Sequence, residues 1–156
     1  MKHPARWTFR LWRWAGLAAL AAVAPWPAGA APVAPDPCSL VTAAELQPLV
    51  GALKGRPSRS GGPGAVTCEF TLAQADGWVE IGLHDGDLGH WKKRNGGKAP
   101  QAQPEFGADA FVNPDFEGSA ELYAKKGTLV LRVSMPKGPA AVEALKAVAR
   151  KALTRL

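Results

Sequence analysis

Residues 66–83 read VTCEFTLAQADGWVEIGL, and the alternation of apolar and polar side chains in this stretch decides the fold. In residues 66–72 the apolar side chains share one face of an extended chain, and residues 78–83 repeat the pattern. The connection between them, residues 74–77, has the length of a hairpin turn. The stretch therefore predicts two antiparallel strands with one buried face.

Further elements follow on both sides of this hairpin. Upstream, Thr42 and Glu45 have the spacing of a capping box, which predicts the start of a short helix. Downstream, the pattern predicts a short helix capped by Asp87, three strands and a closing helix; they cover residues 87–94, 108–113, 119–125, 128–135 and 139–156. The order is αββαβββα. We expect an α+β fold with a single twisted, mainly antiparallel sheet of about five strands and helices packed on one face.

Residues 55–65, GRPSRSGGPGA, separate the first helix from the hairpin. Their glycine, proline and serine content is typical of a mobile loop. Arg56 and Arg59 can hold an anion there, although solvated loop charges are the simpler interpretation. The segment does not match a nucleotide-binding glycine motif.

The first thirty residues have the pattern of a secretory signal peptide. Lys2, Arg6, Arg10 and Arg13 precede an uncharged apolar run over residues 14–24, and residues 28–30, AGA, fit a cleavage site. An uncleaved anchor is the alternative, but the eleven-residue run is short of the roughly 20 residues that span a bilayer. We therefore predict a cleaved signal peptide at residues 1–30, a flexible linker at 31–36 and one α+β domain at 37–156.

Cleavage would change the charge of the chain. The full sequence has a formal charge of +6, and losing four basic and no acidic residues leaves +2. The remaining sequence has no dense basic stripe and no nucleic-acid-reading motif. We expect a periplasmic or secreted protein that binds no nucleic acid and has no stable membrane anchor after cleavage.

Cys38 and Cys68 are the two cysteines of the chain. In an oxidising compartment they can pair as a structural disulfide. A redox pair or two reactive thiols is the alternative. It is disfavoured because the C-x-x-C spacing is absent and the neighbouring Asp36 and Glu69 oppose a thiolate.

Several motifs resemble a known family. Residues 36–46 read DPCSLVTAAEL, residues 68–70 read CEF and residues 107–111 read GADAF, and a strand-Lys-Gly-strand pattern follows over residues 122–133. They resemble exported bacterial domains of unknown function, typified by small actinobacterial lipoproteins with a D-x-C-S-L-x-T-x-x-E opening and a C-x-[FYW] partner. This chain departs from them in lacking the lipobox cysteine. The resemblance implies a Cys38–Cys68 disulfide and an extracytoplasmic binding or sensory role.

Two groups of residues have the composition of a catalytic or metal site. His84, Asp85, Asp87 and His90 could hold a divalent metal, but their spacing matches no standard zinc or calcium loop. A polar strand end followed by a helix cap is the simpler interpretation. Nucleophilic catalysis at Ser119 lacks the usual elbow motif, and Asp115 with Glu117 lies within one loop, where the carboxylate separation needed for glycoside hydrolysis is rare.

The third group follows from strand parity. The predicted inward sets leave a mixed aromatic and charged set on the opposite face of the sheet: Trp78, Glu80, His84, Glu121, Tyr123 and Arg132, with Val130 among them. Aromatic rings beside an arginine suit sugars, anionic headgroups or a partner surface. The alternative is cross-strand pairing, for instance Glu121 with Arg132, and a Trp78 ring covered by residues 106–116.

These observations lead to three hypotheses of function. The first is a noncatalytic binding or sensory module of the cell envelope that needs no cofactor and takes an unidentified envelope ligand or protein on this face. The second is an inhibitor or accessory subunit of an envelope enzyme, which inserts residues 55–65 into a cleft. The third is a small metal-dependent hydrolase built on His84 and His90.

Overall fold

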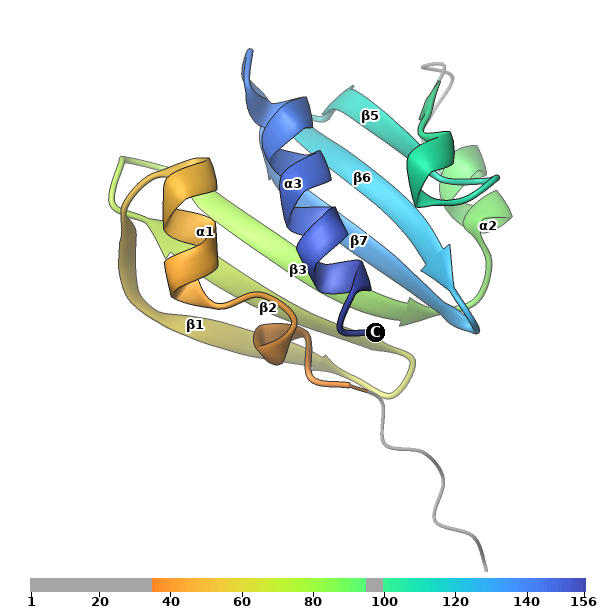
Figure 1. The fold of residues 1–156 in the computed structure, drawn as a ribbon, viewed down its shortest axis with the longest axis horizontal. Coiled ribbons are helices and arrows are strands. Elements are labelled where there is room, and N and C mark those ends of the chain that lie inside the picture. Colours follow the sequence, from red (N-terminus) through yellow and green to blue (C-terminus); the bar gives the residue numbers. More distant parts are fainter. Residues whose placement is uncertain (1–34, 95–99) are drawn as a thin grey trace, which may run out of the picture. The chain divides into compact units, whose positions relative to one another are not determined.

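The structure is a computed structural model that describes residues 35–94 and 100–156; the predicted signal peptide and most of the predicted linker lie outside this part. The described residues form one antiparallel sheet of seven strands in the order β1-β2-β3-β7-β6-β5-β4 (Figure 1). The strands are β1 (Leu53–Gly62), β2 (Ala65–Leu72), β3 (Trp78–Asp85), β4 (Gln101–Ala102), β5 (Phe111–Phe116), β6 (Ser119–Lys126) and β7 (Leu129–Pro136). The helices are α1 (Ala43–Val50), α2 (Leu88–Arg94) and α3 (Ala141–Leu153), with 3-10 turns η1 (Pro37–Ser39) and η2 (Pro104–Phe106).

The α+β class is as predicted, but the count of about five strands and the order αββαβββα are wrong. The described order of α-helices and strands is αβββαββββα. The predicted hairpin forms β2 and β3, which pair in antiparallel register from Ala65 opposite His84 to Thr71 opposite Trp78. The additional strands, β1 and β4, lie at the two edges of the sheet.

Strand β1 corrects the prediction of a mobile loop at residues 55–65. Residues 58–62 pair with residues 65–69 of β2, and the register shifts between Lys54 and Ser58, where Pro57 lies. Proline is tolerated at an edge or a bulge because no partner needs its missing N–H. Nearly all of β1 is exposed on both faces. Without a buried face, its sequence carries no alternating signal.

The inner face of the sheet carries the main core. Helices α1 and α3 lie over this face (Figure 1), and α3 contacts β6, β7 and β5. The core includes apolar residues from both helices and from the strands, among them Leu46, Leu145, Val148, Cys68, Ile81, Leu122 and Val133. Among the described residues no helix has the length and hydropathy of a membrane span.

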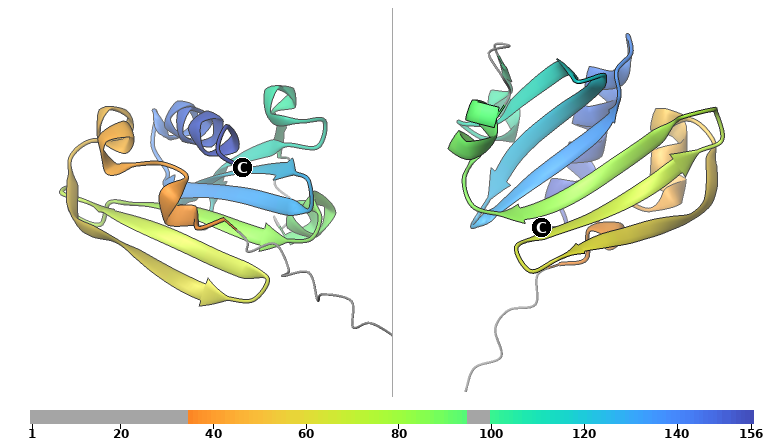
Figure 2. Two further views of the ribbon diagram at one scale, coloured as in Figure 1. Left: turned by 60° about the horizontal axis from the view of Figure 1, so that its bottom comes forward. Right: turned by 180° about the vertical axis from the view of Figure 1, so that it is seen from behind.

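Helix α2 corrects the prediction that all helices pack on one face. Leu88 and Trp91 of α2 form a second buried cluster with Phe111, Tyr123 and Val130. These strand residues alternate with members of the main core, so they lie on the outer face. Figure 2 shows α2 in front of the sheet when the molecule is seen from behind, with α1 and α3 on the far side.

Side-chain hydrogen bonds connect the two ends of the described fold. Thr42 and Glu45 form the predicted capping box at the start of α1. Arg155, beyond α3, donates to both carboxylate oxygens of Glu45 at 2.7 and 2.8 Å and to the Leu40 carbonyl at 2.7 Å. The hydrogen bond from Arg155 and those from Thr42 hold the pKa of Glu45 well below its usual range. These contacts fix the segment before α1 against the carboxyl end of the chain.

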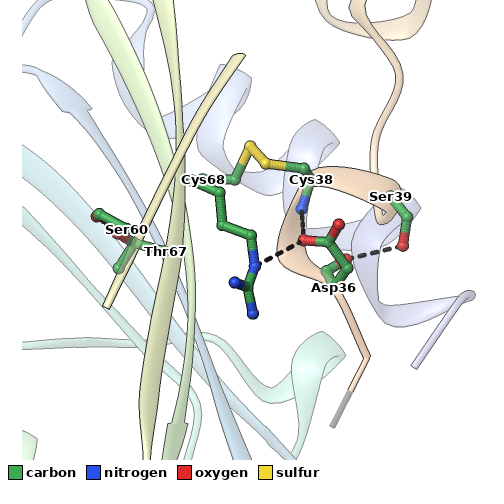
Figure 3. The surroundings of a disulfide bond; sticks show 7 residues. Asp36, Cys38, Ser39, Ser60, Thr67 and Cys68 are labelled. Carbon is green, nitrogen blue, oxygen red and sulfur yellow. Dashed lines mark hydrogen bonds and ion pairs between the residues drawn. A yellow bond between two sulfur atoms is a disulfide. The ribbon is translucent and has the colours of Figure 1, made fainter. Parts of the chain in front are cut away.

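The Cys38–Cys68 disulfide fastens η1 to the inner face of β2 (Figure 3). The Asp36 carboxylate accepts from the Cys38 N–H at 3.1 Å and lies 3.5 Å from Arg59 Nε of β1. On the other face of the same two strands, the hydroxyls of Ser60 and Thr67 are 2.7 Å apart. The disulfide therefore holds the amino-terminal segment against the first strand pair.

Candidate functional site

The six candidate residues predicted from strand parity all lie on the outer face. Two adjacent rows of cross-strand partners contain most of them. In one row Glu80 of β3 is opposite Ser134 of β7, which is opposite Glu121 of β6. In the next row Arg132 is opposite Tyr123. The sheet thus brings together residues that are far apart in the sequence.

Arg132 forms the centre of a partly buried ion network on this face. Its Nη1 donates to Glu80 Oε1 at 2.7 Å, and its Nε and Nη2 both donate to Glu121 Oε1. Burial alone would lower the pKa of Arg132, but the hydrogen bonds and charge of Glu121 raise it above its usual value. The predicted cross-strand pair of Glu121 and Arg132 is therefore confirmed, and Glu80 joins it.

Tyr123, which packs against α2, joins this network through a hydrogen bond. Its hydroxyl donates to Glu121 Oε2 at 2.6 Å, and its ring packs between Phe111 at 4.9 Å and Trp91 at 5.1 Å between centroids. Burial, and then the contact with Glu121, raises its pKa. Tyr123 is 1% exposed, so it can affect a ligand only through Glu121.

His84 lies at the other end of the outer face. Its ring packs edge-on against Trp91, with centroids 4.8 Å apart. A Cβ at Gly82 would lie 2.7 Å from His84 Nε2, so the glycine leaves room for the imidazole ring in its present position. Burial, followed by the charges of Arg132 and Arg94, lowers the pKa of His84.

A pocket of about 400 Å³ opens on the outer face beside the ion network. Three of the candidate residues line it: Trp78, Glu121 and Arg132. The rest of the lining includes Arg94 and Phe116, with Asp76 and Glu117 from two turns. The guanidinium carbon of Arg94 lies 5.7 Å from the Phe116 ring centroid and 5.2 Å from that of Trp91. We call this site the outer-face pocket.

The predicted outer-face set contained three of the ten residues that line this pocket and missed the other seven. Arg94 belongs to α2, and Asp76, Glu117 and Phe116 belong to hairpin ends, so strand parity does not place them. A partial signal existed for the turns, because each of the two acidic residues is followed by a glycine.

The other candidate residues form no catalytic group. His84 and His90 each pack edge-on against Trp91, and among the described residues no cluster of three or more histidine, cysteine or acidic side chains is arranged to hold a metal ion. Ser119 donates to the Phe116 carbonyl at 2.7 Å, while Asp115 forms an ion pair with Lys137 at 3.2 Å. These contacts are those of a hairpin end.

Two further pockets differ from the outer-face pocket in chemistry. One of about 460 Å³ lies between α2 and residues 107–110, where Lys92 and Asp109 form an exposed ion pair at 3.1 Å. No aromatic side chain of the described residues lines it. The other, about 390 Å³, is a largely apolar groove between the end of α1 and the start of α3. Of the three, the outer-face pocket combines aromatic rings with a buried, fixed charge, as ligand sites commonly do.

Comparisons with known proteins give no further guide. No protein-family model matches the chain, and no significant match was found among curated proteins or solved structures.

Proposed function

We propose that this chain is a noncatalytic, extracytoplasmic binding module of the cell envelope that takes a small polar ligand in the outer-face pocket. The observation that carries the proposal is the convergence of the half-buried Trp78 ring with the Arg132–Glu121 network in one pocket. Aromatic faces give contact area, and fixed charges give orientation and specificity.

The extracytoplasmic location is supported by two independent features. The Cys38–Cys68 disulfide is compatible with an oxidising compartment. The sequence of residues 1–30 has the charge, hydrophobic run and small-residue site of a secretory leader. The motif resemblance to exported bacterial domains points the same way.

The chemistry of the buried carboxylate supports binding over catalysis. Glu121 Oε1 accepts from Arg132, and Glu121 Oε2 accepts from Tyr123. A general acid or base must reach the proton it transfers. Since both oxygens of Glu121 are occupied by protein donors, this residue serves as a fixed part of the pocket floor.

The proposal is tested by calorimetric titration of the purified protein with monosaccharides, amino acids and amines. We expect at least one class to bind, and Trp78→Ala to weaken that binding about tenfold while the protein stays folded, because Trp78 is only half-buried. Lys92→Ala in the neighbouring pocket is the matched control and should bind as the wild type does. Binding that survives Trp78→Ala but is lost in Lys92→Ala would place the site elsewhere.

A second candidate function, an accessory subunit, has one observation in its favour. Residues 55–65 do not form a protruding loop, but among the described strands β1 pairs with β2 alone, and it carries the exposed cations Lys54 and Arg56. An exposed edge strand can accept a partner strand. Replacing Arg56, an exposed residue in the unpaired part of β1, by glutamate should weaken an acidic partner bound along this edge and leave binding at the outer-face pocket unchanged.

A further inference from the structure

The outer-face pocket has an excess of negative charge. Its described lining contains the carboxylates Asp76, Glu117 and Glu121 and the guanidiniums Arg94 and Arg132. Glu80 also forms an ion pair with Arg132, at 2.7 Å. The fixed network of Glu80, Glu121 and Arg132 is therefore negative by one charge before any ligand enters.

The positive groups of the pocket already have partners. Arg132 donates to two carboxylates and is mostly buried. Arg94 lies over the rings of Phe116 and Trp91. An anionic ligand would have to compete with these contacts for either guanidinium.

The carboxylates at the rim of the outer-face pocket, by contrast, have no such partners within the described residues. Asp76 and Glu117 are exposed, and within the described chain neither has an ion-pair or hydrogen-bond partner. Both adopt a left-handed backbone, with φ of 56° and 51°, in the turns before β3 and β6. Their carboxylates are available to a ligand from two sides of one pocket.

Trp78 supplies the remaining feature. In the described chain, cations lie over Trp91, Phe116, Phe111 and Phe106, but none lies over Trp78. Tryptophan is the most favourable ring for a cation–π contact. A half-buried ring without a cation, two residues after an unpaired carboxylate, is suited to an incoming ammonium group.

From these contacts we propose that the outer-face pocket binds an organic cation, with its ammonium group over Trp78 and its charge balanced by Asp76 and Glu117. This inference rests on the proposed function and adds the class of ligand. A pocket of about 400 Å³ is at the small end of ligand sites, so the cation is a small amine or quaternary ammonium compound and not a folded partner.

The test is calorimetric titration with choline and putrescine, together with 3,3-dimethyl-1-butanol, the neutral carbon analogue of choline, and with acetate. We expect choline or putrescine to bind and the neutral analogue to bind at least about tenfold more weakly, because it lacks the charge that the ring and carboxylates recognise. Affinity should fall as salt rises from 50 to 500 mM.

Three variants and a matched control locate the cation. Trp78→Leu, Asp76→Asn and Glu117→Gln should each weaken binding about threefold to tenfold. Asparagine tolerates the left-handed backbone at position 76, so folding should be kept. Glu143→Gln removes an exposed carboxylate on α3, away from the outer-face pocket, and it should change affinity less than twofold.

The outcomes separate this inference from the proposed function. If the neutral analogue or acetate binds as well as the cations and still depends on Trp78, the cation inference is wrong and the binding site stands. If the cations bind without dependence on Trp78, or if neither binds at millimolar concentration, the cation inference is overturned. If no small molecule tested binds in a Trp78-dependent way, both fail.

Discussion

The two faces of the sheet are equally buried near its centre but are built from different chemistry. Leu122 and Glu121 are neighbours on β6, 0% and 1% exposed. Leu122 faces the apolar core, where stabilisation follows the area removed from water. Glu121 faces Arg132 and Tyr123, where stabilisation depends on complete hydrogen bonding of buried charge. The inner face therefore supplies most of the stability, and the outer face supplies a fixed polar site at a cost in desolvation.

The largest expected effect on the free energy of unfolding comes from the disulfide on the inner face. Replacing both Cys38 and Cys68 by alanine should lower the free energy of unfolding by about 3 to 4 kcal/mol, because the unfolded chain regains the freedom of a 30-residue loop. Urea denaturation measures the change. A reductant should destabilise the wild type by a similar amount and leave the double variant unaffected. Equal stability of the variant and the oxidised wild type would contradict the structural role of the disulfide.

The second effect tests the apolar core directly. Leu122→Ala should lower the free energy of unfolding by about 3 kcal/mol, through lost burial and the cavity that remains. The loss should be nearly independent of pH and salt, because no charge is involved. Lys125→Ala, at an exposed position on the same strand, is the control and should stay within about 0.5 kcal/mol of the wild type. A loss that varies with salt would show that the two faces are coupled.

The same contrast explains what could be predicted from the sequence. Strands β2, β3, β6 and β7 have one face on the apolar core, so their sequences alternate and their outer-face residues could be assigned. Strand β1 is exposed on both faces and is held by backbone pairing with β2, so its glycine and proline content resembled a loop. An edge strand that is held only by backbone pairing therefore needs no alternation of apolar and polar residues in its sequence.

The outer-face pocket could be predicted only in part for a related reason. Trp78, Glu121 and Arg132 lie within strands, and period two is enough to put them on one face. Arg94 reaches the pocket because α2 packs across that face through Leu88 and Trp91. This tertiary contact could not be predicted from the sequence pattern of a seven-residue helix. Local patterns fix which face a strand residue occupies, whereas packing decides which face a short helix covers.

A third, smaller effect belongs to the outer face. Glu121→Gln keeps the size of the side chain but removes the charge that Arg132 needs, and it should lower the free energy of unfolding by about 2 kcal/mol. The loss should hardly change with salt, because the pair is shielded from solvent. Glu69→Gln on the exposed part of the same face is the control and should cost less than about 0.5 kcal/mol. Equal losses for the two variants would show that the network does not stabilise the fold.

The smallest effect concerns pH. The pKa of His84 is lowered from 6.5, first by burial and then by the charges of Arg132 and Arg94. Below pH 6.5 the unfolded chain therefore binds a proton that the folded chain resists, so stability present at pH 7 is lost as the pH falls. His84→Phe should remove this part of the loss between pH 7 and pH 5.5, as measured by urea denaturation at each pH.

The control for this prediction is Gln74→Ala. Gln74 is exposed and has no group that titrates, so its replacement should leave the pH dependence as in the wild type. Carboxylates contribute mainly at lower pH, because their usual pKa values are near 4, and the interval from pH 7 to 5.5 isolates the histidines. Identical slopes for the wild type and His84→Phe in this interval would mean that the outer face accepts a second cation beside Arg132 without cost, and the contrast between the two faces would then be weaker than the buried network indicates.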